Sequence, residues 1–207
     1  MEMAGLKKWI RPAMRALPSK RSLFIGFLAL IAFLLIAIPL FNRWMYPIKY
    51  EEQIFNSAEA TGADPFLVMA VIRTESKFDP DKESPKGAMG LMQLMPDTVD
   101  EIVERGPFSP AYREHPFDPG MNIHMGSWYL AALKREYKDN EVAAVAAYNA
   151  GAGNVNKWLR EGTWDGSRRN VSNIPFGETR HYIQRVFFYY DKYKSLYGHL
   201  EDETRRK

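Results

Sequence analysis

The chain contains no cysteine among its 207 residues. Disulfides, thiol nucleophiles, thiolate metal sites and a lipid-modified N-terminal cysteine are therefore excluded. Segments in which apolar and polar residues alternate, as is typical of strands, are nearly absent, and no internal repeat is visible. With 46% hydrophobic and 26% charged residues, the composition is that of a globular chain. These features predict a mainly α fold with one compact core.

Positive charge is concentrated at the N-terminus. Residues 1–21 contain six of the 28 lysine and arginine residues, and Glu2 is the only acidic residue there. The other 186 residues therefore carry 22 basic and 24 acidic side chains, so the net charge of +3 comes from the tail. Outside the tail there is no basic stripe interleaved with aromatic residues, and we expect no nucleic-acid partner. The four histidines show no metal-ligand spacing, and we expect no metal.

An uncharged apolar run of 19 residues, 23–41, follows the basic tail. A bilayer core of about 30 Å needs roughly 20 apolar helical residues, so this run is long enough to span it. A signal peptide has a shorter apolar core of about 7–15 residues and a cleavage site of small residues, which this run lacks. The all-round apolar pattern and the basic flank disfavour a buried core helix. We expect an uncleaved, single-pass anchor with the N-terminus in the cytoplasm.

The chain is accordingly divided into five parts. They are a basic cytoplasmic tail (1–21), a transmembrane anchor (22–41), a linker (42–50), a helical domain (51–198) and a charged tail (199–207). Within the domain, helices are predicted at 51–61, from 65 to about 76, 96–103, 122–137, 141–148, 154–160 and 178–197. Residues 82–93 and 106–119, rich in glycine, serine or proline, are predicted loops, the first with a small hairpin.

Glu75 is placed for acid chemistry at the end of an apolar helix stripe. It follows Val71 by four residues and Ile72 by three, which puts the three side chains on one helix face. A carboxyl beside apolar groups loses hydration, so its pKa rises, as a general acid near neutral pH requires. Position alone leaves open a solvated glutamate that pairs with Arg73 or Lys77.

The segment 84–96, S-P-K-G-A-M-G-L-M-Q-L-M-P, is also unusual. Its two glycines allow the backbone to approach another group closely. Gln93 offers an amide donor and an acceptor to a polar ligand. The plainer interpretation, a tight turn that leads into a core strand with the methionines as filler, is not excluded by these residues.

Four motifs then occur in order, namely E-S-K-F from Glu75, the segment 84–96, A-A-Y-N-A-G at 146–151 and E-T-R-H-Y-I at 178–183. Together they closely resemble the lytic transglycosylases of the soluble-lytic-transglycosylase (SLT) type. The resemblance covers about residues 51–197. It implies a lysozyme-like, goose-type helical domain with a small loop or hairpin region, here preceded by one transmembrane helix. With the anchor and orientation expected above, the catalytic domain would lie on the outer face of a bacterial cell membrane.

The resemblance implies roles for residues in the first two motifs. Glu75 falls on the family's sole catalytic acid/base. Ser84 falls on a serine expected to contact the sugar next to the cleaved bond. Gln93 and Met95 fall on residues that line the substrate groove.

The last two motifs supply further expected site residues. Tyr148 and Asn149 are expected near Glu75, with the Tyr148 hydroxyl hydrogen-bonded to the Glu75 carboxyl. Glu178 is expected to be structural or to bind the peptide side of the substrate, and Tyr182 belongs to the same motif. Both tyrosines could equally be core aromatics, and Glu178 could simply stabilise the N-terminus of its helix through its negative charge.

The family's chemistry is cleavage of the β-1,4 bond between N-acetylmuramic acid and N-acetylglucosamine, with a 1,6-anhydro product, in cell-wall turnover. No cofactor is expected. The expected partners are peptidoglycan glycan strands and the membrane, and other cell-wall machinery is left open. Ordinary glycosidases use two carboxylates, and the motifs predict no second one near Glu75. The alternatives are a muramidase that uses water and a non-catalytic wall-binding protein.

Overall fold

The computed structural model describes the backbone of residues 19–204 and the side chains of residues 19–200. Contacts divide the chain into one unit that ends at Pro47 and a second that begins at Ile48. Residues 1–18 of the expected basic tail and the end of the expected C-terminal tail lie outside the described residues.

The described part of the first unit is the helix α1, Lys20–Met45. Its N-cap is Ser19, whose hydroxyl oxygen accepts a hydrogen bond from the Ser22 backbone N–H at 3.2 Å. The helix is 26 residues long, none of its side chains is buried, and its length and composition would allow it to cross a membrane. It extends beyond the predicted span because the polar residues at both ends are also helical.

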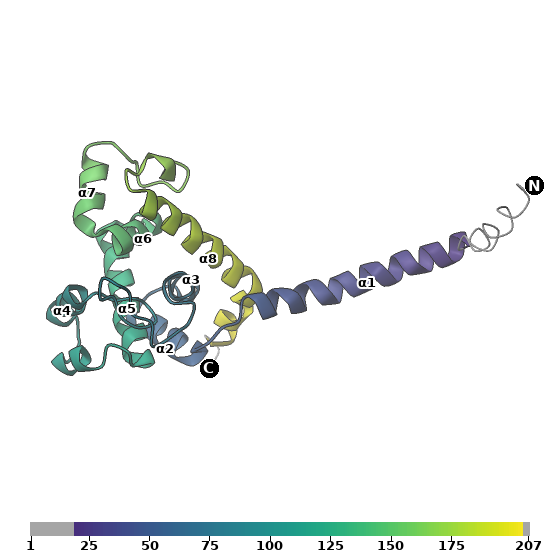
Figure 1. Ribbon diagram of the computed structural model, residues 1–207, viewed down its shortest axis with the longest axis horizontal. Coiled ribbons are helices and arrows are strands. Elements are labelled where there is room, and N and C mark those ends of the chain that lie inside the picture. The colour runs from purple at the N-terminus through teal and green to yellow at the C-terminus, as the bar shows by residue number, and fades with distance from the viewer. Residues whose placement is uncertain (1–18, 205–207) are drawn as a thin grey trace, which may run out of the picture. The chain divides into compact units, whose positions relative to one another are not determined.

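The second unit is built from helices, as Figure 1 shows. They are α2 (Glu51–Thr61), α3 (Pro65–Glu75), α4 (Pro96–Arg105), α5 (Pro119–Glu136), α6 (Glu141–Ala150), α7 (Ala152–Arg160) and α8 (Gly177–Thr204), with 3₁₀ turns η2 (Pro110–Glu114) and η3 (Val171–Asn173). Among the described residues only isolated β-bridges occur, all between residues 83 and 94. The predicted mainly α class and the small hairpin region are confirmed.

Helix α3 forms the centre of the core. Asp64 caps its start, because one carboxylate oxygen accepts hydrogen bonds from the backbone N–H groups of Phe66 and Leu67 at 2.8 and 3.3 Å. Pro65 occupies the first helical position, where no N–H donor is needed. Every residue from 65 to 72 is buried, and the helix packs against α8, α2 and α5. Burial all round this short helix fixes where its C-terminal residue, Glu75, lies.

The C-terminal end of α3 is held by a tight turn. Lys77 and Phe78 both have left-handed backbone conformations, with φ of 57° and 66°. The hydroxyl of buried Ser76 accepts a hydrogen bond from the Phe78 N–H at 3.1 Å and donates one to the carbonyl of Ile72 at 3.2 Å. This serine therefore holds the turn that ends the helix just after Glu75.

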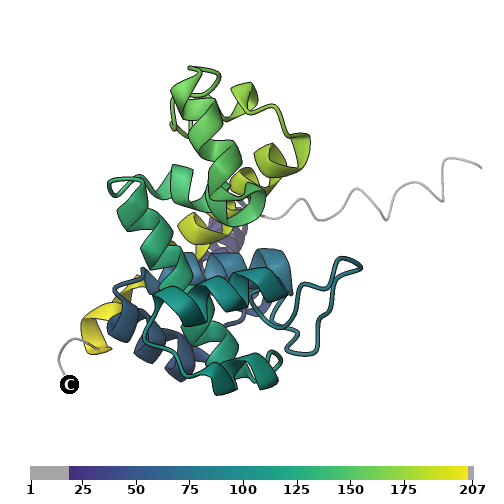
Figure 2. The ribbon, with the colours of Figure 1, turned by 90° about the vertical axis from the view of Figure 1, so that its left-hand side faces the viewer.

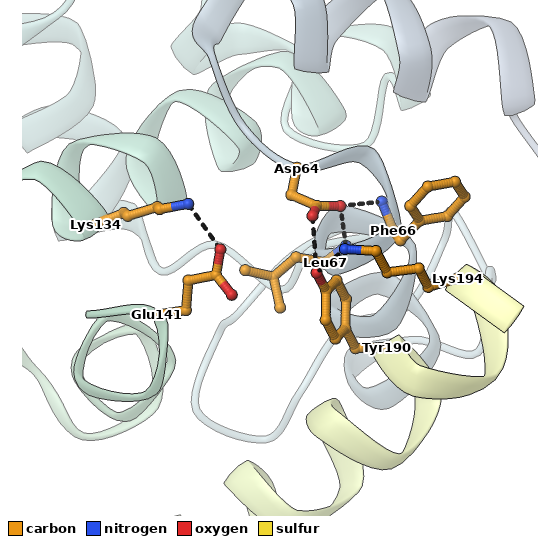
Figure 3. A network of polar contacts seen from close by, with 7 residues as sticks. All are labelled: Asp64, Phe66, Leu67, Lys134, Glu141, Tyr190 and Lys194. Atoms are coloured by element: carbon orange, nitrogen blue, oxygen red, sulfur yellow. Dashed lines mark hydrogen bonds and ion pairs between the residues drawn. The ribbon is translucent and has the colours of Figure 1, made fainter. Parts of the chain in front are cut away.

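Helix α8 is tied to the opposite end of α3 by a polar network (Figure 3). The Tyr190 hydroxyl donates to the second carboxylate oxygen of Asp64 at 2.9 Å, and the Lys194 ammonium donates to the Tyr190 oxygen at 2.9 Å. Nearby, Lys134 of α5 and Glu141 of α6 form an ion pair at 2.7 Å. Asp64 thus caps α3 with one oxygen and anchors α8 with the other.

The loop between α3 and α4 has little regular structure, as Figure 2 shows, and Asn122 of α5 holds it in place. The fully buried Asn122 side chain accepts from the Met92 N–H at 2.8 Å and donates to the carbonyls of Met89 and Pro116 at 3.0 and 2.9 Å. Gly90 has φ of +75°, and a Cβ there would meet the Asn122 amide at 2.4 Å. The close approach expected of this glycine is therefore made to Asn122.

Close packing at Gly126 gives a first prediction. A Cβ added there would lie 2.3 Å from the sulfur and 3.0 Å from the Cβ of Met92, which is fully buried. Gly126→Ala is therefore expected to lower the free energy of unfolding by about 1–3 kcal/mol through overpacking. The measurement is urea unfolding of the detergent-solubilised chain, followed by circular dichroism.

The matched control is Gly120→Ala in the same helix, where the nearest atom to an added Cβ is an Asp118 oxygen at 3.5 Å. It is expected to be neutral or to stabilise by up to about 1 kcal/mol, because alanine favours helix. Equal unfolding free energies for the Gly126 and Gly120 variants would contradict the packing account.

Candidate active site

One open pocket of 520 Å³ contains all seven residues predicted for the site. We call it the Glu75 pocket. Those residues are Glu75, Ser84, Gln93, Met95, Tyr148, Asn149 and Glu178, and the remaining lining comes from Pro85, Lys86 and Ala88. Its walls are therefore the C-terminus of α3, the loop that follows, the C-terminus of α6 and the first turn of α8. Four segments distant in sequence are brought to one hollow.

The Glu75 carboxyl is enclosed although the residue as a whole is partly exposed to the pocket. Burial raises its pKa from 4.5 to about 7, because the ionised form loses hydration. The Tyr182 hydroxyl donates to Glu75 Oε1 at 2.7 Å and, with the nearby charge of Arg185, lowers this pKa, while the charge of Glu178 raises it. Burial has the largest effect, so both protonation states exist near neutral pH.

The tyrosine that contacts Glu75 is not the expected one. The Tyr148 hydroxyl donates to the Met92 carbonyl at 2.9 Å, and Tyr182 makes the bond to Glu75. The expected hydrogen bond from Tyr148 to Glu75 is therefore wrong, although Tyr148 does line the pocket. The reason is the direction of approach: α8 packs along α3 and faces its last turn, whereas Tyr148 faces the loop.

The signal that could have identified Tyr182 is its spacing. It follows Glu178 by four residues on α8, so the two side chains share a helix face. Glu178 lines the Glu75 pocket, and Tyr182 is buried at 2% exposure beneath it. The carboxylate of Glu178, one of the predicted site residues, therefore lies in the same pocket as Glu75, and the expectation that no second carboxylate acts with Glu75 in the reaction stays a prediction.

The loop side chains Ser84 and Gln93 use part of their hydrogen-bonding capacity within the loop. The Ser84 hydroxyl accepts from the N–H groups of Lys86 and Ala88 at 3.3 and 2.9 Å. The Gln93 amide nitrogen donates to the carbonyls of Lys82 and Gly90 at 2.8 and 2.9 Å. Both side chains thus hold the loop that forms one wall of the pocket.

Asn149 is oriented by a residue that sequence reasoning did not select. Its amide oxygen accepts a hydrogen bond from the hydroxyl of buried Thr179 at 2.8 Å. Because the oxygen is used in this bond, the Asn149 amide nitrogen is the group left to donate to a ligand. Thr179 follows Glu178 in the fourth motif. Helix α8 therefore supplies Glu178 to the pocket and also orients Asn149 of α6, as it contacts Glu75 of α3 through Tyr182.

No cluster of metal-ligating side chains occurs in the part of the chain that the structure describes. The expectation that the site needs no metal remains a prediction.

The second unit is thus a mainly helical, lysozyme-like domain that encloses a carboxyl group, that of Glu75, with a raised pKa. The family model for the transglycosylase SLT domain matches residues 52–170, and the chain belongs to that family.

Similar proteins carry related names. The soluble lytic murein transglycosylase of Salmonella typhimurium is 36% identical over 161 residues, which cover 75% of this chain and 24% of that protein. The membrane-bound lytic murein transglycosylase C of Edwardsiella ictaluri is 37% identical over 116 residues, or 52% of this chain and 32% of that protein.

Solved structures of lytic transglycosylases are also similar to this chain. The 70 kDa soluble lytic transglycosylase of Escherichia coli superimposes with a TM-score of 0.68 and 32% identity over 76% of this chain and 26% of that one. An inactive glutamate-to-glutamine mutant of the Pseudomonas aeruginosa lytic transglycosylase Slt gives a TM-score of 0.66 and 34% identity over 72% and 24%. The chain therefore spans about a quarter to a third of the length of these relatives.

The hydrogen bond from Tyr182 to Glu75 gives a second prediction. Because this bond stabilises the ionised carboxylate, Tyr182→Phe is expected to raise the pKa of Glu75 further above about 7. The measurement is ¹³C NMR titration of the glutamate side-chain carboxyls, with Glu75→Gln used to assign the signal.

Tyr148→Phe is the matched control, because it removes a hydroxyl that bonds to the Met92 carbonyl and not to Glu75. In the Tyr148→Phe protein, the pKa of Glu75 is expected to stay near the wild-type value. A Tyr182→Phe protein whose Glu75 pKa is unchanged or lower would refute the assigned role.

Proposed function

We propose that this chain is a membrane-bound peptidoglycan lytic transglycosylase with Glu75 as its single acid/base. The observation that carries the proposal is the pKa of about 7 for Glu75 in a pocket lined by polar side chains. A carboxyl with this pKa can first donate and later accept a proton near neutral pH. The names of the relatives support the reaction class, and the inactive glutamate-to-glutamine mutant of one of them supports the need for a carboxyl.

In the first step, protonated Glu75 gives its proton to the oxygen that links N-acetylmuramic acid to N-acetylglucosamine. The bond from the muramic C1 to this oxygen breaks, and N-acetylglucosamine leaves with a free hydroxyl. Positive charge develops at C1, as in other glycoside cleavages. Burial of the carboxyl supports this step, because it keeps a substantial fraction of Glu75 protonated at neutral pH.

In the second step, ionised Glu75 takes the proton from the C6 hydroxyl of the same muramic acid, and the C6 oxygen bonds to C1. The product end is a 1,6-anhydro sugar, Glu75 is protonated again and no water is consumed. The Tyr182 hydroxyl supports the ionised state between the two steps by its 2.7 Å hydrogen bond. Burial thus favours the protonated state of the Glu75 carboxyl, and the hydrogen bond from Tyr182 favours its ionised state.

Glu178 gives a specific reason to test a hydrolase as the second candidate. It is the other carboxylate of the Glu75 pocket, and a second carboxylate can hold an attacking water. The names of the relatives favour the transglycosylase. The two reactions give different products, since the anhydro end is lighter by one water than the hydrolysed end.

We further propose that α1 anchors the enzyme in a bacterial cell membrane, with the N-terminus in the cytoplasm and the catalytic domain on the outer face. Its exposed apolar side chains and its length support a span, and the basic residues before it support the orientation. Some relatives are named membrane-bound. The enzyme would then act on glycan near the bilayer, in cell-wall turnover or remodelling.

The third prediction concerns Glu75→Gln. Removal of the proton donor is expected to lower the rate of strand cleavage by about 100-fold or more. The measurement is mass spectrometry of the fragments released from purified peptidoglycan, where the wild-type protein should give anhydro ends.

Asp79→Asn is the matched control, because Asp79 is an exposed carboxylate just after the same helix and is outside the pocket. It should cleave at the wild-type rate. Full activity of Glu75→Gln would end the proposal, and hydrolysed ends from the wild-type protein would identify the hydrolase instead.

The fourth prediction concerns the anchor. Deletion of residues 1–45 removes all of α1 and leaves the second unit whole. The shortened protein is expected to be soluble without detergent and to cleave isolated peptidoglycan at a rate similar to that of the full chain. Fractionation and the fragment assay measure the two properties. Continued pelleting of the shortened protein with membranes would contradict the assignment of the anchor to α1.

A further inference from the structure

A second hollow, of 620 Å³, lies between α4 and α5. We call it the distal hollow, and it is lined by Arg105, Trp128, Ala132, Arg135 and Glu136. None of these residues belongs to the four motifs or to the Glu75 pocket. Trp128, Ala132 and Arg135 have the spacing i, i+4, i+7, so they form one face of α5. Arg105, the last residue of α4, closes the other side.

The chemistry of the distal hollow suits a sugar. The ring of Trp128 is supported edge-on by Phe108, with centroids 5.9 Å apart and planes at 88°. Phe108 also packs against Tyr112 and His124, so the indole rests on a braced aromatic cluster. A pyranose ring presents C–H bonds on its faces, and these pack against an indole.

The charged residues around Trp128 supply hydrogen-bonding groups for the polar rim of a sugar. Arg105 is held by an ion pair with Glu101 one turn earlier in α4 and still has donors to offer, because a guanidinium carries five. Arg135 adds further donors and Glu136 an acceptor.

Tyr129, the residue after Trp128 on α5, lies beside the Glu75 pocket. Its ring is 5.7 Å from the ring of Tyr148, which lines that pocket. Burial raises the pKa of Tyr129 to about 12, and the charges of Glu101, Arg105 and Glu136 have smaller effects on it. The helix that carries Trp128 in the distal hollow therefore also contacts the wall of the Glu75 pocket.

Helix α4 gives the separation of the two cavities. Met95, its N-cap, lines the Glu75 pocket, and Arg105, its last residue, lines the distal hollow. Ten helical residues at 1.5 Å each span about 15 Å. A strand of several sugars can bridge that distance, whereas a short fragment bound at Glu75 cannot reach.

We propose that the distal hollow is a remote binding site for the same glycan strand, in which a sugar several units from the cleaved bond stacks on Trp128. The inference rests on the proposed function for its ligand, a polymer of N-acetylated sugars. The site would add affinity for long strands only, and would hold the strand along α4 while its reacting bond lies at Glu75.

The fifth prediction tests this inference by binding. Peptide-free glycan strands of two lengths, a disaccharide too short to bridge the two cavities and a long strand, are titrated into the full chain in detergent by calorimetry. The Glu75→Gln variant is the background, so that the strands stay intact. Adding Trp128→Leu is expected to raise Kd for the long strand about tenfold and to change Kd for the disaccharide by less than about twofold.

Two further variants give a second test of the distal hollow and a control outside both cavities. Ala132→Trp fills the hollow from an α-helical surface position without removing Trp128 from its cluster, and is expected to weaken long-strand binding alone. Phe188→Leu is the matched control, since this exposed aromatic of α8 lines neither cavity, and no change is expected.

Equal changes in Kd for both strand lengths, or no change for the long strand in both the Trp128 and the Ala132 variants, would overturn the proposal. The outcome is independent of the proposed reaction, because binding is measured in a background without the acid. Failure of the wild-type protein to cleave peptidoglycan would count against the proposed function and not against the remote site.

Discussion

The hydrogen bond between Tyr182 and Glu75 joins side chains 107 positions apart in the sequence. It acts against burial: the enclosed position favours the neutral acid, and the hydroxyl favours the anion. With both effects present the pKa of Glu75 is about 7, so both protonation states are populated near neutral pH. Because one partner is on α3 and the other on α8, the proton affinity of the site depends on how these two helices are aligned.

That alignment is fixed at two places along α3. Near the C-terminal end of α3, Tyr182 of α8 bonds to Glu75. Near the N-terminal end of α3, Tyr190 of α8 bonds to Asp64 at 2.9 Å. The two tyrosines are eight residues apart, a little more than two turns of α8, and both bond to groups at the ends of α3. A slide or rotation of α8 would disturb both bonds together, and the capping residue of α3 is thereby linked to the site at the helix's far end.

Local sequence signals predicted the elements well and the contacts between them poorly. Asp64-Pro65 marked the start of α3, and the apolar stripe before Glu75 correctly predicted a poorly hydrated carboxyl. The choice between Tyr148 and Tyr182 as its partner depends on the approach of α6 and α8, which no local pattern contains. The selection of the pocket residues came from the family motifs, since the physical signal at each position was weak.

The extensive tethering of the loop between α3 and α4 has an energetic consequence for ligand binding. Asn122 bonds to Met92 and Met89, Gln93 bonds back to the loop carbonyls, and Ser84 closes its own turn. A recognition segment that is already rigid loses little conformational entropy when a polysaccharide settles on it. Such preorganisation lets a shallow, open surface retain a flexible polymer through few direct contacts.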